Sequence, residues 1–156
     1  MTMLLKTLCA ALTALTLAAM PALALSSAED PFFIWYTFAE LDLDTGEMSD
    51  DLKGLDGKEV EVPGFVVPTE FNEEGVVTEF ILVPSFGYCI HVPPPPPNQM
   101  VYVKMKKPFT VTDIWLPMVV TGKLSLSPVE SEFGEVSYLL EGDEVRVYKG
   151  EGGSML

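Results

Sequence analysis

Five stretches of alternating hydrophobic and polar residues fill most of the chain after residue 57, and they predict β-strands. The alternation and the β-branched and aromatic content are typical of strands with one buried face. The predicted strands are 58–68, 76–85, 99–107, 116–129 and 134–148. Gly64 and Gly122 fall inside two of them and indicate bends that let a strand curl around a small barrel. Without any βαβ pattern, these strands predict an all-β fold, a small five-stranded OB-like Greek-key barrel, with a β-sandwich as the alternative.

A short helix is predicted ahead of the strands. Asp30 is a candidate N-cap and Pro31 suits the first helical position. We expect the helix to cover the open end of the barrel with one apolar face made of Phe33, Trp35, Tyr36 and Phe38. The acidic stretch DLDTGEMSDDLKG that follows is typical of a loop or a single turn. The predicted organisation is therefore a short helix and acidic linker over 25–51, an OB-like β-barrel domain over 52–149 and a flexible tail over 150–156.

The first 24 residues have the form of a secretory signal peptide. A lone Lys6 precedes an apolar run rich in Leu and Ala, and Pro21 is followed by the small residues Ala22 and Ala24. We expect cleavage after Ala24, with a cut after Ala28 as the second choice. The run is short for a membrane span, so retention as an anchor is the less favoured alternative. The prediction is an exported, periplasmic protein with no stable membrane insertion after cleavage.

The charge of the chain excludes one class of partner. The sequence has 9 basic and 23 acidic residues. Because Lys6 is the only charged residue before position 25, removal of the leader gives a formal charge of −15. Nucleic-acid binding depends on Lys and Arg neutralising phosphates, so we expect no nucleic-acid partner.

The only cysteine after the leader and the only histidine of the chain lie two residues apart, at Cys89 and His91. One cysteine cannot form an intramolecular disulfide. In extended backbone the two side chains would project on one face, roughly 6.6 Å apart along the chain. A thiolate and an imidazole are ligands that zinc and copper prefer, so the pair is a candidate metal site. The alternative is a small buried Cys89 and a hydrogen-bonded loop histidine.

Further ligands would have to come from elsewhere in the chain. The candidate carboxylates are Glu70, Glu79 and Asp113. Methionines near the pair would favour Cu(I), although a methionine in a strand is usually a core residue. The methionines concerned are Met100, Met105 and Met118.

Five prolines directly follow the cysteine–histidine pair. Proline has no backbone N–H for a sheet interior, so this run predicts a polyproline II rod of roughly 15 Å. Such rods dock on aromatic grooves with little loss of entropy, which makes the loop a candidate interaction surface. We expect the amides of Asn98 and Gln99 to bond the proline carbonyls. The candidate interaction loop comprises Phe86, Tyr88, Pro93, Pro94, Pro95, Pro96, Pro97, Asn98 and Gln99, with Tyr102 nearby.

Nothing in the sequence favours catalysis. There is no GxSxG elbow, phosphate loop or HExxH motif. A Cys–His nucleophile pair needs the imidazole within hydrogen-bond reach of the sulfur, and i, i+2 spacing on a strand does not align them. We therefore expect a non-catalytic protein.

The run FGYCIHVPPPPPNQMVYV resembles the signature of an uncharacterised family of exported bacterial proteins, marked by Cys-Ile-His-Val, polyproline and Asn-Gln. LDGKEVEVPGFVVP, EFILVP and YLLEGDEVRVY resemble other stretches of that family, so the resemblance runs from about Leu52 to Tyr148. Tyr88 stands where the family has a small residue, which would narrow the approach to Cys89. The resemblance implies a periplasmic protein, sometimes encoded near metal-uptake or ABC transport components, with no established activity. We therefore expect an exported binding protein that serves metal transport or homeostasis, with an envelope transport component or another periplasmic protein as its partner.

Overall fold

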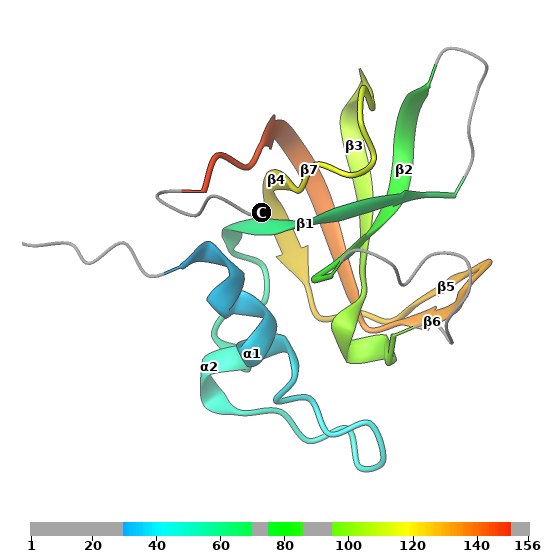
Figure 1. Ribbon diagram of the computed structural model, residues 1–156. Helices are drawn as coiled ribbons and strands as arrows, with labels where there is room; N and C mark the ends of the chain where they lie inside the picture. Colours follow the sequence, from blue (N-terminus) through cyan, green and yellow to red (C-terminus); the bar gives the residue numbers. More distant parts are fainter. Residues whose placement is uncertain (1–29, 70–74, 86–94, 151–156) are drawn as a thin grey trace, which may run out of the picture.

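The described part of the chain folds as a β-barrel with short helices at one end (Figure 1). The structure is a computed structural model that describes residues 30–69, 75–85 and 95–150. None of the helices in these ranges is long and apolar enough to cross a membrane.

Five strands close the barrel in the order β1, β2, β3, β7, β4 and back to β1. β3 and β7 run parallel, and every other neighbouring pair in the barrel is antiparallel. The prediction of a small all-β barrel of five strands is confirmed, and the strand order and directions fit the OB type rather than the alternative sandwich. The barrel strands are β1 (Glu59–Pro68), β2 (Val76–Val83), β3 (Val101–Thr110), β4 (Met118–Ser125) and β7 (Tyr138–Val147).

The last two predicted strands are shorter in the structure than the alternation suggested. β4 ends at Ser125, ahead of Pro128, and a separate two-stranded hairpin follows it. The hairpin consists of β5 (Val129–Ser131) and β6 (Gly134–Val136), and Gly134 provides the positive φ of 101° that its tight turn requires. Hydrophobic alternation continues through such a hairpin, so it does not show where the barrel strand ends and the hairpin begins.

Gly64 and Gly122 both lie where the barrel bends, as predicted. The first half of β1 pairs with β4 up to Gly64, and the second half pairs with β2 from Phe65 onward. A Cβ on Gly64 would lie 2.8 Å from the carbonyl oxygen of Val83. The register between β4 and β7 shifts at Gly122, where a Cβ would overlap the carbonyl oxygen of Glu141. Both positions need glycine because another backbone passes too close for a side chain.

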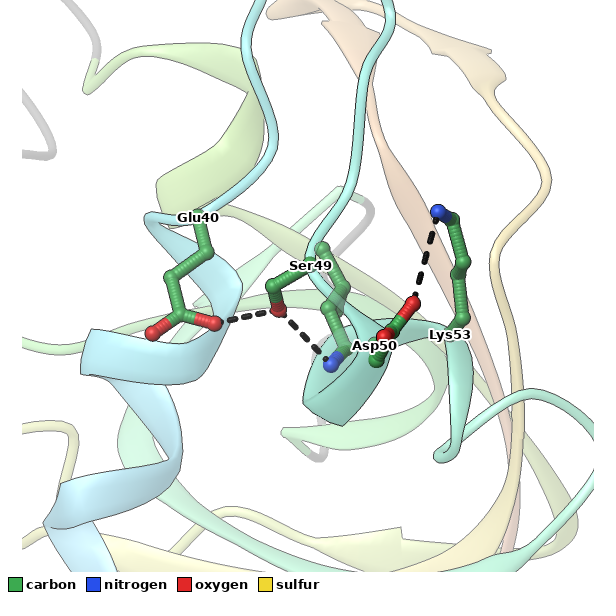
Figure 2. Close-up of polar contacts among 5 residues, drawn as sticks. Glu40, Ser49, Asp50 and Lys53 are labelled. Carbon is green, nitrogen blue, oxygen red and sulfur yellow. Dashed lines mark hydrogen bonds and ion pairs between the residues drawn. The ribbon is translucent and has the colours of Figure 1, made fainter.

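The N-terminal segment folds as the 3-10 turn η1 (Pro31–Phe33) followed by α1 (Ile34–Phe38). The Asp30 carboxylate caps this segment by accepting the N–H of Phe32 at 3.0 Å. The single turn α2 (Asp50–Lys53) follows, with Ser49 as its N-cap. The Ser49 hydroxyl donates to the Glu40 carboxylate, as Figure 2 shows, and accepts the N–H of Leu52, which ties α2 to the chain just after α1.

The four aromatic residues expected on one helix face divide between two faces. Trp35 and Phe38 are buried in the main core, and the Trp35 indole N–H donates to the carbonyl of Pro63 on β1 at 2.6 Å. Phe33 and Tyr36 are exposed. The prediction of a single face was wrong because residues three apart share a face of a helix, so 35 pairs with 38 and 33 pairs with 36. The inner pair covers the barrel, and the outer pair faces solvent.

Candidate functional site

The residues that carried the predicted metal chemistry lie outside the described residues. This applies to Cys89, His91 and Glu70, and likewise to Phe86, Tyr88, Pro93 and Pro94 of the predicted interaction loop. The described chain ends at Ser85 before this segment and resumes at Pro95 after it.

Both ends of the segment are held on the barrel. Leu82 of β2 pairs directly with Val101 of β3, so residues 86–94 connect neighbouring strands. Val83 and Met100, just inside these ends, are both buried in a second, smaller core cluster. Pro95 is buried and Pro96 is exposed. The base of the connection is therefore a fixed part of the fold.

Asn98 and Gln99 lie in the 3-10 turn η2 (Pro97–Gln99) and hold the N-terminal helix. The Asn98 amide, which is buried, donates to the carbonyl of Leu41 at 2.9 Å. The Gln99 amide donates to the carbonyl of Trp35 at 3.1 Å. The sequence suggested proline carbonyls as the acceptors, whereas these bonds go to Trp35 inside α1, whose carbonyl also accepts the Ala39 N–H, and to Leu41, which lies just after the helix.

A third donor reaches the same helix from β7. The hydroxyl of Tyr138 donates to the carbonyl of Phe38 at 2.7 Å, and the two rings stack with centroids 4.6 Å apart. Sequence reasoning missed these three anchors because each joins residues 57 or more positions apart. No local pattern could have revealed them.

The candidate carboxylates among the described residues have other partners. Glu79 accepts the Tyr102 hydroxyl at 2.5 Å and pairs with the Lys104 ammonium at 3.8 Å. The Asp113 carboxylate accepts the N–H of Trp115 at 2.8 Å. Within the three described ranges, no group of three or more His, Cys, Asp and Glu side chains is arranged to hold a metal ion.

The three methionines pack with the apolar interior. Met100 is buried in the smaller cluster, and Met105 and Met118 are half-buried against the main core. Their positions follow from strand alternation and do not favour a copper site.

A hollow of about 410 Å³ lies between α1 and the base of the 86–94 connection. Phe32, Trp35, Tyr36 and Ala39 line it from the helical side. Pro84, Ser85 and Gln99 line it from the barrel side. Among the described residues this is the place where aromatic side chains, a concave surface and the predicted functional loop meet.

Comparisons with known proteins agree on one family. The model of a family described as a protein of unknown function, DUF3299, matches residues 43–147. The crystal structure of a DUF3299 family protein from Pseudomonas aeruginosa PAO1 is similar, with 37% sequence identity and a TM-score of 0.60. That alignment covers 86% of this chain and 87% of the other. A comparison with curated proteins finds no match.

Proposed function

The chain belongs to DUF3299, a family of proteins of unknown function, and from that premise we propose that it is an exported, non-catalytic binding protein. In this proposal Cys89 and His91 hold zinc or copper, and the protein is an accessory to metal transport or homeostasis in the periplasm. Membership in this family confirms the family resemblance, and the family has no established activity. The bound metal, the export and the partner are parts of the proposal.

The chemistry of the two residues supports the metal. Sulfur and imidazole nitrogen are the ligands that zinc and copper prefer. The rest of the chain after the leader offers no other cysteine or histidine. Two ligands leave coordination positions for water, a partner's side chain or a carboxylate, which suits a protein that passes a metal on.

The observation that carries the proposal is the anchoring of both ends of the 86–94 connection. Val83 and Met100 are buried together, and Asn98 and Gln99 donate to the carbonyls of Leu41 and Trp35. A metal site loses less entropy on binding when its supporting residues are already fixed. The ends of the segment that carries Cys89 and His91 are therefore already placed before any ligand binds.

Thermal melts of the mature protein with and without zinc or copper test the proposal. Binding to the folded state should raise stability by about 2.7 kcal/mol when the free metal is 100 times Kd. Cys89→Ser and His91→Ala should each remove most of this shift and leave the metal-free melting temperature unchanged. Glu130→Gln is the matched control, because Glu130 is an exposed carboxylate of β5 that is not among the candidate ligands, and it should retain the full shift. A wild-type protein that responds to neither metal would refute the metal site.

A protein-interaction module that uses the polyproline loop without metal is the second candidate. The exposure of Pro96, three residues before Gln99 of the hollow's lining, favours it. Its partner would be an envelope transport component or another periplasmic protein, and the acidic charge excludes nucleic acid. Equilibrium dialysis separates the two candidates, since a mature domain that binds neither zinc nor copper supports the interaction module.

A further inference from the structure

The outer face of α1 has two large aromatic side chains that the fold leaves in solvent. Tyr36 is 71% exposed and Phe33 is 58% exposed, and their ring centroids are 5.5 Å apart. Tyr36 also lines the hollow beside Trp35 and Phe32. Neighbouring exposed aromatic residues, one of which lines a hollow, are typical of binding surfaces.

The segment of chain that contains this apolar surface is strongly acidic, and we call its carboxylates, within residues 30–56, the acidic belt. The stretch 31–39 has no charged residue, and Asp30 and Glu40 lie directly before and after it. Residues 30–56 together contain eight carboxylates and one lysine. The N–H groups of Thr45 and Asp44 lower the pKa of the Asp42 carboxyl, so this part of the belt stays ionised well below neutral pH. An acidic segment with an apolar stretch favours a partner of opposite charge.

We propose that the hollow and the outer face of α1 form a docking site for a segment of another protein that presents an apolar anchor flanked by Lys or Arg residues. The anchor enters the hollow against Tyr36, Trp35 and Pro84, and the basic flanks lie over the carboxylates. The site uses neither Cys89 nor His91, so the inference is independent of the proposed metal binding.

The charge distribution favours this occupant over two others. A second copy of the chain would bring the same carboxylates against each other across a symmetric interface. An anionic membrane surface would be repelled by the same belt. A segment with an apolar centre and basic flanks is complementary both to the hollow and to the carboxylates of residues 30–56.

Isothermal titration calorimetry of the mature protein in EDTA tests the proposal with three synthetic peptides. The peptide KKGLFPLGKK has an apolar centre and basic flanks, EEGLFPLGEE reverses the flanks, and KKGSSPSGKK removes the apolar centre. We expect saturable binding of the first peptide that weakens as salt is raised, and at least about tenfold weaker binding of each of the other two.

Variants of the exposed aromatic residues locate the binding. Tyr36→Ala and Phe33→Ala should each raise Kd about tenfold or more, a typical effect of losing an aromatic anchor. Both side chains are mostly in solvent, so the variants should keep the wild-type melting temperature. Ile114→Ala is the matched control, because Ile114 is an exposed apolar residue between β3 and β4, and it should bind like wild type.

Several results would overturn the proposal. These are no saturable binding of KKGLFPLGKK, equal binding of the charge-reversed peptide, or wild-type affinity in both aromatic variants. A concentration-dependent dimer in sedimentation that Tyr36→Ala abolishes would assign the face to a second copy instead.

Discussion

Replacing Tyr138 by Phe tests how the N-terminal helix is fastened to the barrel. Tyr138 is fully buried at the start of β7, and its hydroxyl donates to the carbonyl of Phe38 at 2.7 Å. Phe keeps the ring and its stacking on Phe38, so the change removes one buried hydrogen bond and little packing. Within the described residues, the Phe38 carbonyl then keeps the Leu41 N–H as its donor, in a long bond of 3.4 Å.

The expected loss is about 1–2 kcal/mol, the usual cost of leaving a buried acceptor poorly satisfied. For a domain of this size that corresponds to a melting temperature lower by about 4–8 °C. Urea unfolding of Tyr138→Phe against wild type, followed by circular dichroism, measures it. Tyr102→Phe is the matched control, because the Tyr102 hydroxyl bonds the exposed Glu79 carboxylate, and its removal should cost less than about 0.5 kcal/mol.

Alkaline pH gives this prediction a second, independent readout. Burial raises the pKa of the Tyr138 hydroxyl above its usual value of about 10. The unfolded chain therefore releases this proton first, so the stability that Tyr138 contributes is complete below pH 10 and falls as pH rises above it. The difference between wild type and Tyr138→Phe should shrink by up to about 1.4 kcal/mol per pH unit above 10. Equal stabilities at neutral pH, or parallel curves above pH 10, would refute the reasoning.

Two further predictions concern the barrel and the leader. Gly122→Ala should destabilise the protein by at least about 3 kcal/mol in urea unfolding, because the added Cβ would meet backbone atoms of Glu141 and Gly142. Gly46→Ala is the control, because Gly46 lies in open space at φ 74°, and it should cost only about 1–2 kcal/mol. Similar losses at both positions would contradict a steric cause. Intact-mass analysis of exported protein should show a chain that begins at Leu25 or close to it, and a mature protein that retains Met1 would contradict the signal peptide.

The barrel could be predicted from the sequence because its determinants are local. Alternation marks each barrel strand, and glycine inside a strand marks a bend, which the close approach of other backbone to Gly64 and Gly122 explains. Asp30 and Pro31 likewise predicted the start of the helical segment. The Asp30 carboxylate, which accepts the Phe32 N–H, confirms it. These features depend on neighbours within a few residues.

The surroundings of the predicted site could not be read in the same way. Asn98, Gln99 and Tyr138 meet α1 or the chain just after it across long stretches of sequence, and only the closed barrel brings them there. The hollow likewise combines residues from α1, the end of β2 and η2. The hollow forms only when these elements pack together, and no hydrophobic periodicity in the sequence reports that packing.

The predicted interaction loop therefore contains residues of two kinds. Asn98 is buried and Gln99 is bonded to α1, so a loss of function on changing either could follow from a displaced helix. Pro96 is exposed and its side chain makes none of these bonds. Its carbonyl accepts the Gln99 N–H at 2.8 Å, a backbone bond that a substitution at position 96 can retain. Because α1 also forms one wall of the hollow, a displaced helix would weaken peptide docking as well as stability. A change in metal binding can therefore be attributed to Cys89 and His91 themselves when peptide affinity and stability both keep their wild-type values.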